Sequence, residues 1–380
     1  MIYADYNGSA PLLGAVKDYL NKRIASNLFA NPNAIHSMGQ KVFAAIEKSR
    51  GIIAEAVGCY PDQIIFNSGA SEGVSHIIYS ILSQVSIDKR VILTGATEHA
   101  VVPDTLSAYK DFEIKTIKHD ENGVTDLNHL RKLLNENKVA LVTVMAANNE
   151  TGTILPYQEI AKICNEQDVE YFCDTTQLIG KGEFNFEKSG LNYAVVSGHK
   201  LGALPGSGFL IVKEPTKLKA LIHGSGQEQS LRGGTQNYLG IETLAVAINE
   251  FKNNKDKLEA LENSKKKFEE NIIKSFSEVV VISRNAPRLA GTTLIGYKGI
   301  HGQAVQIELE SNDIFVTTSA ACSDNQPETS DVLKAMGIDD QLGRGVIRIS
   351  LTYSHGEQEY SAIASALKSA YNKLGRIQSY

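Results

Sequence analysis

Residues 169–200 read "VEYFCDTTQLIGKGEFNFEKSGLNYAVVSGHK". Two apolar runs in this stretch end in polar side chains: Asp174 follows the first run, and Ser197, His199 and Lys200 follow the second. Apolar strands that alternate with helical or polar segments indicate parallel pairing by crossover, and hence an open α/β sheet covered on both faces. Such sheets bind ligands beyond the carboxyl ends of their strands, so these polar residues are candidates for a binding site.

The same alternation extends on both sides of this stretch. An amphipathic helix is expected at residues 39–58, with Gly58 as its stop, because its apolar residues recur on one helical face. Further short apolar segments, separated by helical or polar stretches, predict strands at residues 63–69, 90–96, 113–119, 139–147 and 208–213.

The pattern changes after residues 241–276, which read as one long helix or two. Beyond them, short strands and helices mix in the way that is typical of a smaller α+β domain. We therefore expect a large domain at residues 14–254, and a small domain built from residues 1–13 and 255–380, with a hinge near residue 255.

Composition excludes several classes of protein. The chain has 380 residues, 42% hydrophobic content and a formal net charge of −5, so neither nucleic acid nor an anionic membrane is expected as a partner. No apolar run is long enough for a bilayer span, and the first residues lack the features of a secretory signal. Four scattered cysteines favour neither a disulfide framework nor a metal site: Cys59, Cys164, Cys173 and Cys322. We expect a cytoplasmic protein with a small ligand and no bound metal.

Several polar residues at strand ends have an ordinary interpretation beside a functional one. The Gly/Ser turn at residues 68–73 opens a helix, so it is either a phosphate site or a common helix cap. His99 follows a strand, where most histidines are simply capped or exposed. Residues 148–150, two asparagines and a glutamate, are equally typical of a turn.

Asp174 and Lys200 point to a more specific chemistry. A carboxylate that follows an apolar strand lies in poorly solvated surroundings and needs a cationic partner. Pyridoxal phosphate requires a lysine for its Schiff base, a carboxylate beside its ring nitrogen and a helix N-terminus for its phosphate. The strand ends of this chain supply all three.

A series of motifs, in order along nearly the whole chain, carries a family resemblance. They are "NPNAIHSMG" (31–39), "SGASE" (68–72), "TEH" (97–99), "NNETG" (148–152), "DTTQ" (174–177), "SGHK" (197–200), "RGGT" (232–235), "SAAC" (319–322) and "RIS" (348–350). With these motifs the chain resembles the cysteine desulfurases of the NifS/IscS type, which are class V, fold-type I pyridoxal-phosphate enzymes. The resemblance implies an α/β fold with a mainly parallel sheet in the large domain and a smaller α+β domain.

The resemblance also implies a role for each matching residue at the cofactor. Thr235 would reach the cofactor phosphate of the other subunit in a homodimer. Within one subunit, Lys200 would form the Schiff base and Asp174 would contact the pyridinium nitrogen. His99 would stack on the ring and move protons, while Asn149 and Gln177 would lie on the phenolic oxygen side. The phosphate would be held by Ala70, Ser71, Ser197 and His199.

Cys322 lies in "VTTSAACSDNQPETS" (316–330), a polar stretch without hydrophobic periodicity. Taken alone, this cysteine is a small buried residue or an incidental one in a loop. The resemblance implies that it is the nucleophile, which takes sulfur from L-cysteine as a persulfide and leaves L-alanine. Arg348 would bind the substrate carboxylate through its guanidinium fork, with Asn149 nearby. A polar segment with little to bury suits an arm that enters the site and leaves it again.

The chain departs from the family pattern in places. Gln229 stands where arginine is usual, and Thr352 where glycine is usual. The segment after the last expected helix is short, so an iron-sulfur scaffold protein is a less certain partner than a sulfur acceptor in general. Two other enzymatic activities remain open, selenocysteine lyase and aminotransferase. A non-catalytic interaction protein of the same fold is the remote alternative.

Overall fold

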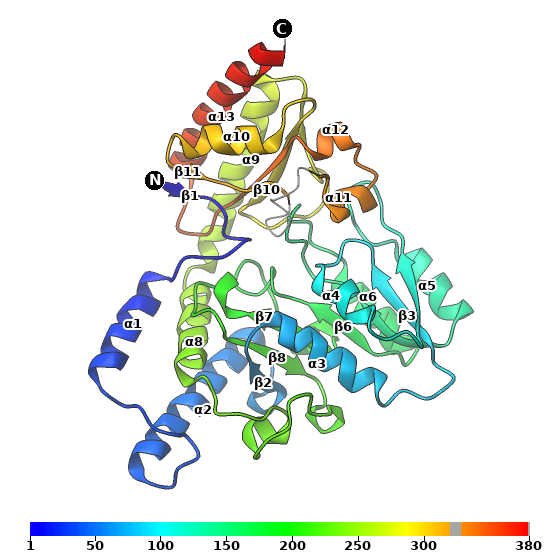
Figure 1. The fold of residues 1–380 in the computed structure, drawn as a ribbon, viewed down its shortest axis with the longest axis vertical. Coiled ribbons are helices and arrows are strands. Elements are labelled where there is room, and N and C mark those ends of the chain that lie inside the picture. Colours follow the sequence, from blue (N-terminus) through cyan, green and yellow to red (C-terminus); the bar gives the residue numbers. More distant parts are fainter. Residues whose placement is uncertain (320–327, 379–380) are drawn as a thin grey trace.

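The structure is a computed structural model that describes residues 1–319 and 328–378. Within these ranges the main sheet has seven strands in the spatial order β2-β8-β7-β6-β5-β3-β4 (Figure 1). Their bounds are β2 (Ile64–Asn67), β3 (Val91–Gly95), β4 (Glu113–Ile117), β5 (Val139–Thr143), β6 (Tyr171–Asp174), β7 (Tyr193–Ser197) and β8 (Gly208–Val212).

Helices cover both faces of this sheet. Along β6, Tyr171 and Cys173 belong to one core cluster and Phe172 belongs to the cluster on the other face, because successive side chains of a strand alternate. Helices α3 (Ala70–Leu82) and α4 (Val101–Leu106) pack on the Phe172 face. The opposite face is covered by α2 (Ser37–Val57), α5 (Leu127–Glu136), α6 (Tyr157–Glu166), α7 (Phe186–Ser189) and α8 (Tyr238–Lys252). The expected fold class, with its mainly parallel sheet, is confirmed.

One strand departs from the crossover pattern. β8 pairs antiparallel with β7 on one side and with β2 on the other, whereas β3 to β7 pair in parallel. Residues 198–207 join β7 to β8, and this connection is too short for the helix that a parallel crossover needs. The 3-10 turn Gly198–Lys200 therefore lies inside a hairpin rather than at the start of a crossover.

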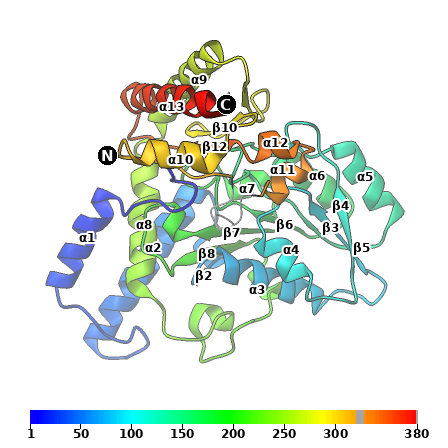
Figure 2. The same ribbon diagram turned by 45° about the horizontal axis from the view of Figure 1, so that its top comes forward.

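A second group of elements packs around separate hydrophobic clusters (Figure 2). Its described strands form an antiparallel sheet in the order β12-β10-β9, with a parallel pair β1-β11 beside it. The strands are β1 (Ile2–Tyr3), β9 (Val279–Val281), β10 (Thr292–Tyr297), β11 (Ile314–Phe315) and β12 (Val346–Ser350). The helices are α9 (Leu258–Ser275), α10 (Gly302–Glu310), α11 (Asp331–Ala335), α12 (Asp340–Gly343) and α13 (Glu357–Gln378).

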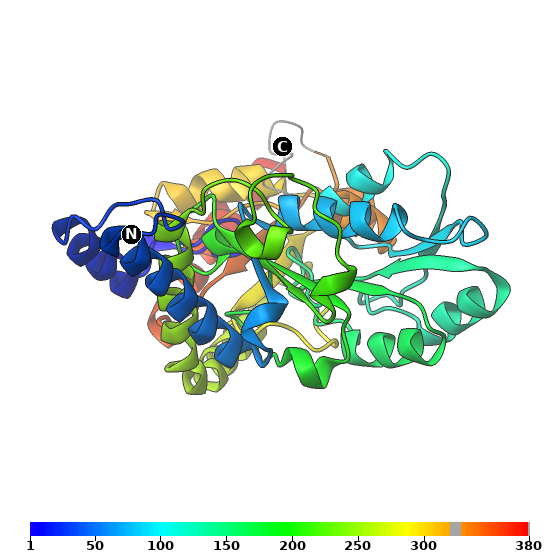
Figure 3. The ribbon, with the colours of Figure 1, turned by 90° about the horizontal axis from the view of Figure 1, so that it is seen from below.

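Residues 241–276 form two helices rather than one. The 3-10 turn Lys255–Lys257 separates α8 from α9. The division into domains at this point, with its hinge, stays a prediction. Helix α1 (Gly14–Ala25) and the start of α2 lie at one end of the molecule, as the blue ribbon of Figure 3 shows. No helix among the described residues is long and apolar enough to cross a membrane.

Candidate active site

Asp174 and Lys200 lie at the carboxyl ends of two neighbouring strands. Asp174 is the last residue of β6, and Lys200 ends the turn that follows β7, the parallel partner of β6. The Asp174 carboxylate is buried and accepts a hydrogen bond from the Thr176 N–H (2.9 Å). It forms no ion pair with any described residue, so the cationic partner expected for it has to come from elsewhere.

Asn7 joins the strand-end residues into one network. Its carbonyl oxygen accepts hydrogen bonds from the Lys200 Nζ (2.8 Å) and the Gln177 Nε2 (3.0 Å). Its side-chain oxygen accepts one from the Lys181 Nζ (2.8 Å), which also donates to the Gln177 Oε1 (2.5 Å). Lys200 donates a further hydrogen bond to the carbonyl of Gly8. The segment that follows β1 thus forms one wall of the site.

Arg348, on β12, faces the same network. Its Nη2 donates to the Asp5 carboxylate (2.7 Å) and its Nη1 to the Asn149 carbonyl (3.0 Å). The Nε of Arg348 and the side-chain oxygen of Asn149 are buried and have no hydrogen-bond partner among the described residues. A guanidinium with a donor to spare, beside an amide with an acceptor to spare, is suited to binding a polar ligand.

The start of α3 lies beside the end of β7. Gly69, which precedes the helix, has a φ of 147°, and a Cβ there would lie 3.3 Å from the Ser197 Oγ. Ala70 is half-buried, Ser71 is exposed and Ser197 is buried. Ser197 therefore contributes a hydroxyl next to the amino end of a 13-residue helix, where anions are stabilised.

Several basic groups lie close together in this part of the molecule. His199 hydrogen-bonds to the Ser9 hydroxyl (3.1 Å), and burial, together with Lys200 and Lys181, lowers the pKa of its imidazole to about 4. Burial, together with Lys200 and Arg348, lowers the pKa of Lys181 well below its usual range. Crowded cations of this kind lower one another's pKa until an anion neutralises them.

His99 lies between β3 and α4, and its Nδ1 accepts a hydrogen bond from the Val101 N–H (3.2 Å). Its neutral ring therefore carries the proton on Nε2, which can be presented to a ligand. The adjacent Glu98 is buried, its Oε1 accepts from the Met145 N–H (2.8 Å), and its Oε2 has no partner among the described residues. Burial raises the pKa of Glu98 well above its usual range, and the Asp174 carboxylate adds to this.

The predicted site residues are thus brought together unequally. Direct contacts link Lys200, Gln177, Asn149 and Arg348 through Asn7 and its neighbours, and Ser197 lies beside the start of α3. No described side-chain contact joins His99 to Asp174, although the Asp174 carboxylate raises the pKa of Glu98, the neighbour of His99. Thr235 is exposed in the segment before α8, and Cys322 lies outside the described residues.

Three residues of the site were missed by sequence reasoning. Asn7 and Lys181 gave no motif signal, because their partners are distant in the chain; the polar, small-residue stretch "DYNGSAP" was the available hint. Glu98 could have been noticed as a carboxylate directly after a buried strand. No cluster of three or more potential metal ligands occurs in the described part of the chain.

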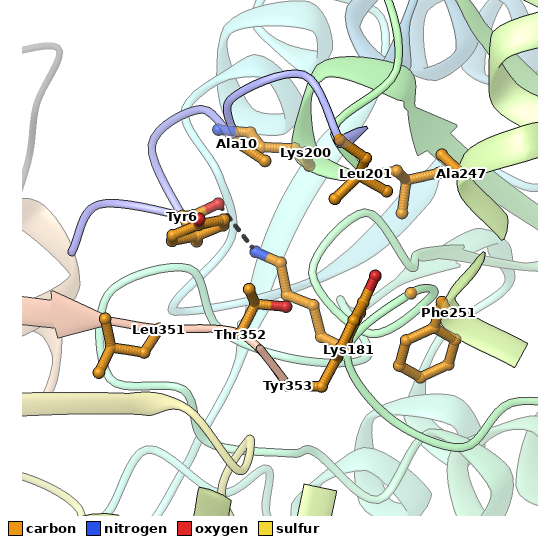
Figure 4. A pocket seen from close by; sticks show the side chains of 12 residues that line it. Tyr6, Ala10, Lys181, Lys200, Leu201, Ala247, Phe251, Leu351, Thr352 and Tyr353 are labelled. Atoms are coloured by element: carbon orange, nitrogen blue, oxygen red, sulfur yellow. Dashed lines mark hydrogen bonds between the residues drawn. The ribbon is translucent and has the colours of Figure 1, made fainter. Parts of the chain in front are cut away.

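A pocket lies next to the hydrogen-bond network around Asn7 (Figure 4). It is lined by Tyr6, Lys181, Lys200, Phe251 and Thr352, among others, and the Lys181 Nζ donates to the Tyr6 carbonyl there (3.2 Å). Thr352 therefore lines the same pocket as the two lysines.

Comparison with known proteins defines the class of the chain. The model of the family described as "Aminotransferase class-V" matches residues 2–362, so the chain belongs to that family. The cysteine desulfurase IscS of Dictyoglomus turgidum is 31% identical over 382 residues, which cover 100% of this chain and 96% of the relative. The resemblance to the cysteine desulfurases is thereby confirmed.

Solved structures agree with this assignment. A NifS-like protein superposes with a TM-score of 0.89 at 30% identity, covering 98% of this chain and 100% of the other. The structure of SspA in complex with cysteine gives a TM-score of 0.80 at 28% identity, covering 92% and 99%. The similarity extends over more than nine-tenths of this chain in both structures.

Proposed function

We propose that the protein is a pyridoxal-phosphate-dependent cysteine desulfurase that converts L-cysteine to L-alanine and leaves a persulfide on Cys322. The observation that carries this proposal is the position of Lys200 and Asp174 at the ends of adjacent parallel strands, where Lys181 and His199 lie close to Lys200. The names of the relatives, and the SspA complex with cysteine, support the choice of substrate.

The residues of the crevice fit the cofactor. Asp174 is a buried carboxylate without an ion-pair partner among the described residues, as a protonated ring nitrogen requires. Gly69, Ala70 and Ser71 form the start of α3 and Ser197 lies beside it, which suits a phosphate, and His199 is proposed to bind it as well. Asn149 and Gln177 supply amide groups for the phenolic oxygen side. Thr235 would serve the phosphate of a second subunit.

When bound, pyridoxal phosphate withdraws electrons from the amino acid attached to it and weakens the bond between Cβ and Sγ. Lys200 would hold the cofactor through its amine, which in this structure donates to the Asn7 carbonyl. His99 presents Nε2, because Nδ1 is occupied by the Val101 N–H, and moves protons there. Arg348 binds the carboxylate of the substrate, with Asn149 beside it.

Cys322 supplies the nucleophile of the sulfur transfer. Its thiolate attacks the sulfur of the bound cysteine, the carbon–sulfur bond breaks, and the electron pair and a proton end on the alanine that leaves. L-cysteine and one thiol thus become L-alanine and one persulfide, without an external oxidant. An acceptor thiol then takes the outer sulfur, and iron-sulfur assembly or tRNA thiolation are the proposed uses.

A homodimer is part of the proposal. Thr235 is exposed, so its hydroxyl is available to a second subunit. Large apolar side chains are also left uncovered around α1 and the start of α2, as is common at protein interfaces: Ile24 (58% exposed), Phe29 (43%), Ile35 (96%), Met38 (39%) and Phe43 (44%). The enzyme is proposed to act in the cytoplasm. Its proposed large domain comprises residues 14–254, and its small domain comprises residues 1–13 and 255–380.

The test is product formation by the purified yellow protein with L-cysteine and dithiothreitol. We expect alanine and sulfide in equal amounts, because each persulfide formed is reduced once by the dithiol. Cys322→Ala should keep the cofactor absorbance and release neither product. Cofactor binding without alanine release by the wild type would refute the desulfurase proposal. Alanine release that survives in Cys322→Ala would refute the role of Cys322.

A further inference from the structure

The turn that follows β5, at residues 148–152, is held by its own side chains. The Asn148 Oδ1 accepts hydrogen bonds from the backbone N–H groups of Glu150 (2.9 Å) and Thr151 (2.9 Å). Gly152 completes the turn with a φ of 74°. Asn149 and Glu150 therefore project from a fixed backbone. Glu150 contacts one end of the segment that carries Cys322, and Asn149 is linked to the other end through Arg348.

Asn149 is linked to the start of that segment. Its carbonyl accepts from the Arg348 guanidinium (3.0 Å), and the backbone N–H of Arg348 donates to the Thr317 carbonyl (2.6 Å). Thr317 and Ser319 are both buried. This end of the segment is thus attached to β12 and, through Arg348, to the turn.

Glu150 contacts the other end directly. The Ser330 hydroxyl donates to the Glu150 Oε2 (2.6 Å), and the two residues are only 7% and 5% exposed. The same hydroxyl accepts from the Leu333 N–H (3.2 Å), because Ser330 is the N-cap of α11. The neighbouring Thr329 donates to the Asp340 carboxylate (2.7 Å), a second contact that does not involve the turn.

We infer that Glu150 is a positioning residue, whose hydrogen bond to Ser330 fixes the carboxyl-terminal end of the segment carrying Cys322 against the cofactor site. The inference rests on the proposed function, because it takes Cys322 as the nucleophile. Asn149, one residue away, accepts a hydrogen bond from Asn7 (3.2 Å), and Asn7 in turn accepts from Lys200. The turn at residues 148–152 thus connects both ends of the segment to the hydrogen-bond network of Lys200, at one end through Glu150 and at the other through Arg348.

The contact does not depend on the charge of Glu150. Burial raises the pKa of this carboxyl to about 7 and the Asp331 carboxylate adds to this, while Ser330 and Arg348 lower it. Either protonation state keeps an oxygen that accepts from the Ser330 hydroxyl. Gln offers the same acceptor, so Glu150→Gln is the conservative variant, and Glu150→Ala removes the contact.

Amide hydrogen exchange tests the contact without turnover. In the cofactor-loaded protein without L-cysteine, we expect residues 328–336 to exchange about tenfold faster in Glu150→Ala and Ser330→Ala, because a cap bond of this kind holds the local structure closed. Glu150→Gln should exchange within about twofold of the wild type. Asp339→Ala is the matched control, because Asp339 caps the neighbouring α12 through the Leu342 N–H (3.0 Å) without touching the turn.

Single-turnover release of alanine then tests positioning. We expect it to slow about tenfold in Glu150→Ala and Ser330→Ala, and no further in the double variant, since a misplaced reacting group costs rate. The spectral change on binding L-cysteine, and the release rate of Asp339→Ala, should stay as in the wild type. Unchanged exchange in Glu150→Ala overturns the inference, and so does faster exchange with an unchanged release rate. Failure of the wild type to release alanine sinks the proposed function instead, and exchange still decides whether the contact holds the segment.

Discussion

Two arginine–carboxylate pairs near the small sheet, Arg288–Glu269 in its core and Arg348–Asp5 at the candidate site, are built differently. In the small sheet's core, Arg288 donates two parallel hydrogen bonds to Glu269 (2.8 and 2.8 Å), and the side chains are 5% and 2% exposed. In the crevice, Arg348 donates one bond to Asp5 (2.7 Å) and keeps a buried Nε without a partner among the described residues. The first pair is complete within the chain, whereas the second has a donor left over.

The difference separates a structural pair from a binding one. A two-bond fork neutralises both ions and uses the geometry of guanidinium fully. The crevice instead gathers Arg348 with Lys181, Lys200 and His199, and burial and mutual repulsion lower the pKa values of Lys181 and His199. Such a site is arranged for anions from outside, and the proposed function assigns to it a phosphate and a carboxylate.

The largest expected effect concerns the complete pair. Glu269→Ala leaves Arg288 buried without its carboxylate, so the free energy of unfolding should fall by about 3–5 kcal/mol. Denaturation followed by circular dichroism measures it, since the chain has no tryptophan. The exposed neighbour Glu270 offers the control Glu270→Ala, which should change little. A loss below about 1 kcal/mol would mean that this pair is not structural.

Arg348→Lys is expected to act on catalysis rather than on stability. Lysine keeps the charge near Asp5 but loses the planar fork, so kcat/KM for L-cysteine should fall about 100-fold, mostly through KM. The free energy of unfolding should stay within about 1 kcal/mol of the wild type, because the charge pair survives. The distinction between a structural and a binding pair would be wrong if Arg348→Lys lowered the free energy of unfolding as much as Glu269→Ala and left kcat/KM for L-cysteine unchanged.

The lowered pKa of His199 predicts a pH effect in the cofactor-free protein. The pKa of this imidazole is about 4 in the folded state, whereas in the unfolded chain it returns to its ordinary value of about 6.5. Its contribution to stability is therefore present above pH 6.5 and is lost as the pH falls through about 4, an effect of about 1–2 kcal/mol for a half-buried group. Equal acid sensitivity of His199→Asn and wild type in urea denaturation would contradict it.

Gly69 should show the smallest effect. An alanine at a φ of 147° is strained and brings its Cβ to within 3.3 Å of the Ser197 hydroxyl, so we expect cofactor affinity to fall about fivefold to tenfold. Titration of the cofactor absorbance measures the change. Gly51→Ala, inside α2 with open space around its Cβ position, is the matched control and should be neutral or slightly stabilising.

Local patterns in the sequence predicted the parts of the fold that depend on neighbours in the chain. Buried strands such as β6 and the amphipathic α2, ended by Gly58 with a φ of 68°, follow from composition and periodicity. The antiparallel β8 did not follow, because its apolar run resembles that of a parallel strand and only the short connection from Lys200 distinguishes it. Lys200 and Asp174 were found because both follow strands.

The remaining site residues depend on contacts between distant segments. Asn7 meets Gln177, Lys181 and Lys200 only after the fold brings these segments together. Neither periodicity nor spacing encodes such a meeting, and a polar residue in a loop has no signal of its own. The roles assigned to Cys322 and Thr235 rest on the family resemblance, so they stay predictions.

The position of Asn7 has a consequence for synthesis of the protein. Its N–H donates to the Ser350 hydroxyl (2.9 Å), and the Ser350 N–H donates to the Ala4 carbonyl (2.8 Å), so segments separated by more than 300 residues must meet. A ribosome that has released only the seven-stranded sheet has not yet made β12. The nascent chain can therefore fold its main sheet early, but the proposed cofactor site is complete only after β12 has been made.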